Sequence, residues 1–331
     1  MPTMTKRQRL EAAIAGEAVD RVPVSLWRHW PGDDQRADDL AYATLKFQRD
    51  YDFDFIKFTP SSNYCIADYG QTSRWLGNEE GTRVWGQHLI QTPDDWLALK
   101  PLDPQQGLLG EIVRAVQIIR REAPDVPFIP TIFNPLAQAK NLAGENFIPH
   151  LREHPVAVKT GLATLTETTL RFIEAVKPAG IAGIFLALQH ATRTLLSETE
   201  YRTFGVEYDL QLLDATEGWF NVVHLHGEHV MFDLAATYPV QVINWHDRET
   251  PPSLAEGQAI FRRAVCGGIR RWNTMVRGTP DDVRAEIADA IAATGGRRLI
   301  IGTGCVTPIV APTANIRAAR QAVEEQRATS G

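Results

Sequence analysis

The feature that most constrains the fold is a regular alternation of short apolar runs with longer helical stretches. Eight such runs are rich in β-branched and other apolar residues, and they lie at 22–27, 53–59, 126–133, 181–189, 220–226, 240–246, 264–269 and 298–304. Runs that are apolar on both faces, each followed by a helical pattern, are typical of parallel strands buried between helices. The pattern predicts an α/β fold, a (β/α)₈ TIM barrel, with a doubly wound open sheet as the alternative.

Helix signals strengthen this interpretation in the second half of the chain. The stretches 253–263 and 279–294 begin after Ser253 and Thr279, which are good N-caps, and Pro280 suits a first helical turn. Residues 60–120 fit the alternation less well, and we expect an irregular insertion there, a long loop or small hairpin. Because no repeat or linker divides the chain, we expect residues 1–331 to form a single domain.

Composition limits the classes of function. The 331 residues are 44% hydrophobic, enough for a large core, and a net charge of −6 argues against nucleic acid or an anionic membrane as partner. The N-terminus reads as an amphipathic helix without an apolar signal core. Three scattered cysteines do not make a disulfide framework, so we expect a cytoplasmic protein with free thiols. As oligomeric state we expect a monomer or a homodimer.

Candidate metal ligands gather at three predicted strand ends. His224 and His226 end the fifth run, His246 and Asp247 the sixth, and Cys305 follows the eighth. Residues two apart on a strand face the same side, and barrel chemistry occurs at the carboxyl ends of the strands. Imidazole nitrogen and thiolate sulfur suit Zn²⁺. The alternative is that these histidines are ordinary hydrogen-bonded residues of polar strand ends.

The chain is similar to the uroporphyrinogen decarboxylase superfamily over nearly its whole length. The opening "RLEAAIAGEAVDRVPVSLWRH" resembles the superfamily's first helix, D-R-x-P turn and first strand. The closing part resembles its glycine pair, its "GTP-x-x-V" helix start, its "GG-x-x-LI" strand and its P-x-x-N-I helix. The resemblance implies the same barrel independently of the strand count.

Two chemistries occur in that superfamily, and the metal-free decarboxylases are the poorer match. Arg28, in "LWRHWPGDD", matches the first arginine of their substrate-binding motif, but the second arginine is missing. The aspartate that their second strand supplies is absent from "KFTPSSNY", and "TGCVTP" lacks the histidine of their last strand.

The other chemistry belongs to the zinc-dependent corrinoid methyltransferases. Their pattern is His-x-Cys late in one strand and a cysteine about 75–80 residues later, which His224, His226 and Cys305 match with histidine in place of the first cysteine. The resemblance implies Zn²⁺ as cofactor, and methylcobalamin carried by a partner corrinoid protein as the source of methyl groups. With two histidines, the group bound by the metal is a thiol, a water, an alcohol or an aryl ether oxygen.

The remaining predictions concern the walls of the pocket. We expect Arg28 to hold a substrate carboxylate, and His246 or Asp247 to complete or orient the metal shell, so these three are the candidate catalytic residues. Four further residues are expected to bind substrate, and these are Asn134, Gln189, His190 and Tyr64. Three hypotheses follow: a zinc-dependent methyltransferase or demethylase, a metal-free decarboxylase centred on Arg28, and a barrel that only binds a ligand.

Overall fold

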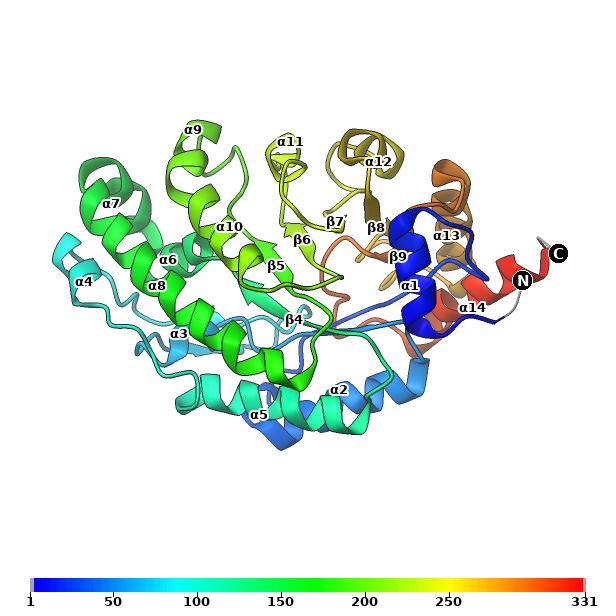
Figure 1. Ribbon diagram of the computed structural model, residues 1–331, viewed down its shortest axis with the longest axis horizontal. Helices are drawn as coiled ribbons and strands as arrows, with labels where there is room; N and C mark the ends of the chain where they lie inside the picture. The colour runs from blue at the N-terminus through cyan, green and yellow to red at the C-terminus, as the bar shows by residue number, and fades with distance from the viewer. Residues whose placement is uncertain (1–2, 330–331) are drawn as a thin grey trace.

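The structure is a computed structural model that describes residues 3–329, with side chains described as far as residue 325, and it confirms the (β/α)₈ barrel (Figure 1). In this part of the chain, seven parallel strands form one sheet in chain order. They are β1 (Ile56–Phe58), β4 (Phe128–Phe133), β5 (Phe185–Leu188), β6 (Val222–Leu225), β7 (Val242–Asn244), β8 (Ala264–Ile269) and β9 (Leu299–Thr303). Parallel neighbours need crossover connections, and these supply the helices around the sheet.

The barrel is closed by the segment 22–27, the first predicted strand. Val24 forms a parallel bridge with Ile301 of β9 and accepts a hydrogen bond from the backbone N–H of Asp54, just before β1, at 3.0 Å. The segment therefore lies between the two ends of the sheet and occupies the eighth strand position. Pro23 has no N–H to donate, and this weakens a continuous ladder here.

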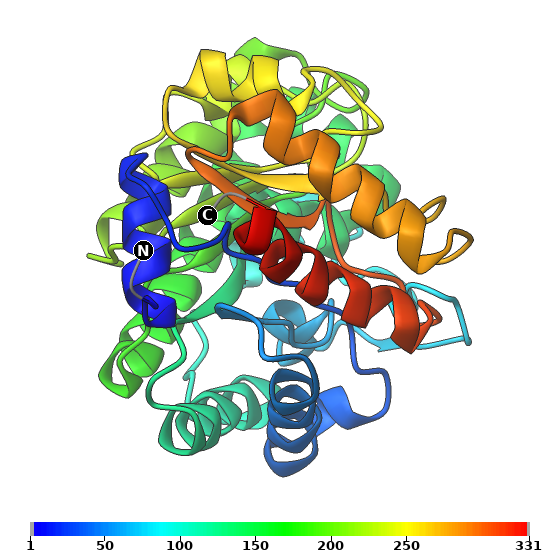
Figure 2. The same ribbon diagram turned by 90° about the vertical axis from the view of Figure 1, so that its right-hand side faces the viewer.

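Helices cover the outside of the barrel. The longer ones are α1 (Lys6–Ala15), α2 (Ala37–Tyr51), α5 (Gly107–Glu122), α6 (Pro135–Ala143), α7 (Phe147–Glu153), α8 (Pro155–Val176), α10 (Glu207–Asp214), α12 (Leu254–Phe261), α13 (Pro280–Thr294) and α14 (Thr313–Thr329). Ser253 and Thr279 are the N-caps of α12 and α13, and each side chain accepts a backbone N–H. The last two helices pack side by side (Figure 2). Among the described residues, no helix is both long and apolar enough to cross a membrane.

The stretch predicted to be irregular lies between β1 and β4. It contains α3 (Tyr64–Ala67), an antiparallel hairpin of β2 (Ser73–Arg74) and β3 (Val84–Trp85), and α4 (Pro93–Ala98). Its last part is the regular helix α5, so regular structure resumes earlier than residue 120. The backbone N–H of Ile309, after β9, donates to the carbonyl of Glu79 near the hairpin tip at 2.8 Å.

Side chains alternate between the barrel interior and the layer between sheet and helices. On β6, Val222 belongs to the interior cluster, whereas Val223 and Leu225 pack in the outer core. Leu10 of α1 joins the interior cluster together with Phe220. Helix α1 therefore covers the end of the barrel opposite to the strands' carboxyl ends.

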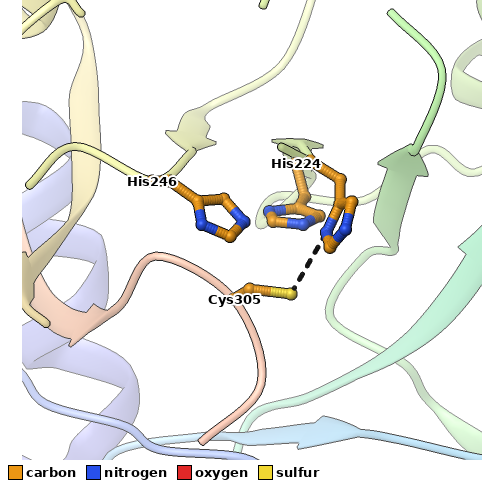
Figure 3. Close-up of side chains that lie close together, drawn as sticks. His224, His246 and Cys305 are labelled. Atoms are coloured by element: carbon orange, nitrogen blue, oxygen red, sulfur yellow. Dashed lines mark hydrogen bonds between the residues drawn. The ribbon is translucent and has the colours of Figure 1, made fainter. Parts of the chain in front are cut away.

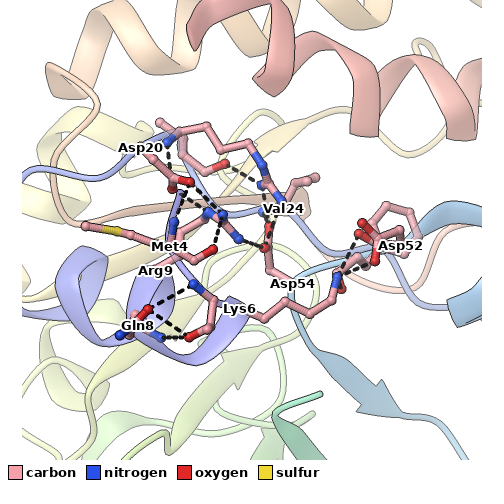
Figure 4. A network of polar contacts seen from close by, with 12 residues as sticks. Met4, Lys6, Gln8, Arg9, Asp20, Val24, Asp52 and Asp54 are labelled. Atoms are coloured by element: carbon pink, nitrogen blue, oxygen red, sulfur yellow. Dashed lines mark hydrogen bonds and ion pairs between the residues drawn. The ribbon is translucent and has the colours of Figure 1, made fainter. Parts of the chain in front are cut away.

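A buried ionic network fixes α1 to the start of the barrel (Figure 4). Arg9 of α1 contacts Asp20 at 2.7 Å and Asp54 at 2.8 Å, and Arg21 contacts Asp54 at 2.6 Å. Asp54 also accepts the backbone N–H of Val24 at 2.8 Å. The "DRVP" turn thus supplies two members of a network that joins the first helix, the closing segment and the start of β1.

Candidate metal centre

Four possible ligands converge at the carboxyl ends of the strands (Figure 3). His224 lies on β6 and His226 directly after it, His246 follows β7, and Cys305 follows β9. One ligand atom from each of the four side chains lies within 4.8 Å of the others. The Sγ of Cys305 is 3.5 Å from Nδ1 of His226. The structure thus brings together the three residues that the sequence predicts as metal ligands. It places His246, which the sequence offers together with Asp247 to complete or orient the metal shell, beside them.

The alternation of strand side chains explains why two histidines of β6 reach one cavity. His224 and His226 both line the interior, and Leu225 between them packs outward. Gly304 allows Cys305 to approach from β9. A Cβ at Gly304 would lie 2.7 Å from the Cα of His246, which real Cβ atoms do not tolerate.

A second residue fixes the protonation of His224. Nδ1 of His224 is 2.7 Å from Oδ1 of Asn244, and the Asn244 amide donates to the carbonyls of Cys266 and Thr303 at 2.8 and 3.1 Å. These two bonds identify Oδ1 as the oxygen, so Nδ1 of His224 is the donor. In the neutral ring, Nε2 then carries a free lone pair, as a metal ligand requires.

His246 is oriented in a similar way by a carboxylate. Its Nδ1 lies 3.0 Å from Oε2 of Glu249, and its Nε2 is buried without a hydrogen-bond partner among the described residues. A buried polar atom without a partner calls for an explanation, and a metal ion is one. The carboxylate–histidine pair is the arrangement that commonly supports a histidine ligand.

The electrostatics of the three cysteines differ. Burial raises the pKa of the thiols of Cys65 and Cys266. Burial acts in the same direction on Cys305, but the neighbouring His224 and His226 outweigh it and hold the pKa of that thiol well below its usual value. Cys305 is therefore the cysteine prepared to act as a thiolate. Three imidazoles and one thiolate form a donor set that suits Zn²⁺.

His224, His226 and Cys305 form one wall of a cavity that holds about 550 Å³ of space when its mouth, which opens to solvent, is included. The opposite wall includes Trp27, Phe185 and Lys57, and the Phe185 ring stacks on His224 with centroids 5.3 Å apart. Gln189, predicted to bind substrate, also lines this cavity. The arrangement places a small bound molecule against the metal ligands on one side and aromatic rings on the other.

The other predicted substrate-binding residues lie elsewhere in the described structure. Asn134 caps α6 and donates to Asp209 at 2.8 Å, in a buried network behind the barrel wall. Tyr64 is buried and donates to the carbonyl of Thr131 at 2.7 Å, so it supports the wall. His190 follows Gln189 but is not among the cavity-lining residues described.

Two predicted catalytic residues also point away from the cavity. Arg28 lies on the outer side of its segment, with its guanidinium 5.0 Å from the Trp30 ring centroid, because Trp27 and His29 take the inward positions. Asp247 turns toward β8 and accepts the backbone N–H of Gly268 at 3.1 Å. Arg28 therefore lies outside the cavity that His224, His226 and Cys305 line.

Four residues at or near the site are not among those predicted from the sequence. Lys57 is a charged residue inside an apolar strand pattern, and that alone is a usable signal for a functional position. If Trp27 points into the barrel, the alternation of side chains along this segment places His29, two residues later, inward as well. Asn244 and Glu249 act through the orientation of histidines, and sequence spacing gives no indication of such contacts.

Comparisons with known proteins agree with this architecture. The sequence model of the Uroporphyrinogen decarboxylase (URO-D) family matches residues 5–326. The chain is 24% identical to Methylcobamide:CoM methyltransferase MtaA from Methanosarcina barkeri, over 98% of this chain and 99% of that protein. A second protein of that name, from the Fusaro strain of the same species, is 23% identical over the same shares.

Two solved structures share the fold. A methyltransferase from Methanosarcina mazei superposes with a TM-score of 0.86 at 20% identity, over 98% of this chain and 99% of that one. A B12-independent methionine synthase from Shewanella sp. W3-18-1 superposes with a TM-score of 0.65 at 11% identity, over 94% and 99%. Since the family match extends over nearly the whole sequence, the chain belongs to the uroporphyrinogen decarboxylase family.

Proposed function

We propose that the protein is a zinc-dependent methyltransferase or demethylase that moves a methyl group between a corrinoid and a small molecule. One observation carries the proposal: the ligand atoms of His224, His226, His246 and Cys305 meet at one point, and three of these four residues line a cavity. The relatives named as methylcobamide:CoM methyltransferases, similar over almost their entire length, support the same reaction class.

His224, His226, His246 and Cys305 are the residues that would hold the zinc. Bound Zn²⁺ supplies a Lewis acid that favours the deprotonated form of a thiol or hydroxyl group beside it. Asn244 keeps Nε2 of His224 free of a proton. The aromatic rings of the opposite wall limit water around the small molecule, and this strengthens electrostatic interactions within the cavity.

The corrinoid is expected to come from a partner protein at the cavity mouth. The resemblance described above implies such a carrier. Even with its open mouth included, the space of about 550 Å³ suits a small molecule, whereas a corrinoid ring with its nucleotide is larger. The competing hypothesis, decarboxylation with Arg28 as the carboxylate clamp, lacks support because Arg28 faces outward.

The test is the metal content of protein purified without a histidine tag. We expect about one zinc per chain, and we expect Cys305→Ser and His226→Ala to lose it. His229→Asn is a matched control, because His229 is exposed on the same loop and asparagine tolerates its φ of 50°.

Zinc-loaded protein is then mixed with methylcobalamin and a panel of small thiols, and demethylation of the corrinoid is followed by absorbance. Protein that takes up no zinc when zinc is supplied would contradict the proposal.

A further inference from the structure

Lys57 is a buried lysine for which the proposed chemistry has no role. It lies on β1, lines the cavity, and is 6% exposed. Its Nζ contacts Oγ1 of Thr59 at 3.3 Å, and among the described residues it has no ion pair with a carboxylate. An ammonium group has three donors, and burying it is unfavourable. Burial lowers the pKa of Lys57 to about 7, and the negative charge of the Cys305 thiolate acts against that shift.

The surroundings of Lys57 stabilise its charge only weakly. Its Nζ lies 4.5 Å from the ring centroid of Phe185 and 5.8 Å from that of Trp27, and such rings attract a cation without accepting its hydrogen bonds fully. Glu80 also lines the cavity, but it is paired with Arg271 at 2.7 Å. This carboxylate is therefore already paired and does not act as the counter-ion of Lys57.

A second polar side chain on the same wall has one unmatched nitrogen atom. His29 is 6% exposed, and its Nδ1 is buried without a hydrogen-bond partner in the described part of the chain. Burial, followed by the positive charge of Lys57, lowers the pKa of His29 to about 4, so the ring is neutral. Two buried polar groups therefore face one cavity with hydrogen-bonding capacity to spare.

We propose that Lys57, with His29, forms an oxyanion subsite that holds the carboxylate or sulfonate of the substrate. The Phe185 ring contacts both Lys57 and His224, so it spans the space between this subsite and the metal ligands. The substrate is thus a compact organic acid whose anionic group binds Lys57 and whose thiol or ether group lies at the metal end. Only the assignment of the reacting end rests on the proposed function.

The experiment compares two thiols that differ in charge, 3-mercaptopropionate and 3-mercapto-1-propanol. Calorimetric titration of the zinc-loaded protein should give a dissociation constant for the acid about ten- to a hundredfold lower than for the alcohol, as a charged hydrogen bond implies. Lys57→Met should abolish this preference and leave the zinc content unchanged. Lys100→Met is the control, because Lys100 is exposed, and it should keep the preference.

Other outcomes would overturn the inference. Equal affinity for both thiols, binding of neither, or an unchanged preference in Lys57→Met would each do so. The ligand-free Lys57→Met protein should melt at the same temperature or higher, since a buried amine without a carboxylate partner is removed. A melting temperature several degrees lower, or loss of zinc, would instead give Lys57 a structural role in the fold or the metal centre.

The same pair of thiols also separates this inference from the proposed function. If the protein holds zinc and demethylates methylcobalamin but shows no preference for the acid, only the oxyanion subsite is wrong. If the protein takes up no zinc but still prefers the acid in a Lys57-dependent way, the subsite holds and the methyltransferase proposal fails.

Discussion

Glu249 contacts no substrate or metal directly in the proposed site, yet it decides how well His246 serves as a ligand. Its carboxylate accepts the Nδ1 proton of His246 at 3.0 Å. Burial alone would lower the pKa of His246, but Cys305 and Glu249 together raise it to about 9. The carboxylate thus makes the ring more basic, and a more basic imidazole binds a metal more tightly.

We expect Glu249→Gln to weaken zinc binding about ten- to a hundredfold, because the neutral amide supports His246 less well. Competition with a chromophoric chelator measures the zinc affinity of the variant against the wild type. Glu153→Gln, at an exposed position of α7, is the matched control. Zinc affinity of Glu249→Gln equal to that of the control would show that the Glu249 carboxylate does not support zinc binding through His246.

At the residue scale, the spacing of residues along a strand predicts the members of the site better than their chemical type does. His224 and His226 were placed on one face by their two-residue separation, and the structure has them there. Arg28 is expected at the cavity because it follows an apolar run. Side chains alternate along the segment, however, and a position one residue after the inward Trp27 faces outward. Lys57 is not predicted as a site residue because the apolar residues before and after it indicate only a buried strand.

At the scale of elements, the approach of β9 to β7 brings Cys305 to the histidines. Gly304 is the point of contact: a Cβ there would lie 2.7 Å from the Cα of His246 and 2.8 Å from the carbonyl oxygen of Trp245. Both are backbone atoms, so neither can move aside by a simple rotation of a side chain. A larger residue must therefore separate the two strand ends.

We expect Gly304→Ala to lower the zinc affinity at least tenfold and to destabilise the fold by about 1–3 kcal/mol, the usual cost of overpacking. Zinc competition and thermal unfolding measure the two effects, and far-UV circular dichroism shows whether the barrel is intact. An alanine variant that binds zinc as the wild type does would mean that the strand ends can move apart without cost to the site.

Element boundaries were less predictable than element order. Seven of the eight predicted runs contain the strands of the sheet, because their apolar pattern reports burial on both faces. β8 matches its run, and the other strands are shorter than theirs because flanking residues stay buried without continuing the ladder, as at His246. The hairpin within 60–120 lacks a comparable pattern because its strands are two residues each and largely exposed.

At the scale of the whole molecule, acid should unfold the barrel partly through the network around α1. Burial opposes the charge of Asp20, but its contacts with Arg9 lower the pKa of that carboxyl to about 2. Its pKa in the unfolded chain is near 4, so the folded state is stabilised above pH 4, by about 2 kcal/mol for this shift. This contribution is lost as the pH falls from 4 through 2.

We expect Asp20→Asn to be about 3 kcal/mol less stable than the wild type at pH 7, because Arg9 loses a buried charged partner. The difference between variant and wild type should shrink as the pH falls toward 2. Urea unfolding at several pH values measures it, and Asp125→Asn, at an exposed position, is the control. A difference that is independent of pH would show that the charge of Asp20 does not stabilise the fold.

The cavity walls come from different parts of the chain, and this has an evolutionary consequence. The metal ligands lie between His224 and Cys305, whereas the facing wall of Trp27, Lys57 and Phe185 is encoded by the first 185 residues. Substitutions in the early strands can therefore change which molecule is accepted while the ligand set stays intact. A barrel divided in this way can acquire new substrates one wall at a time, without rebuilding its reactive centre.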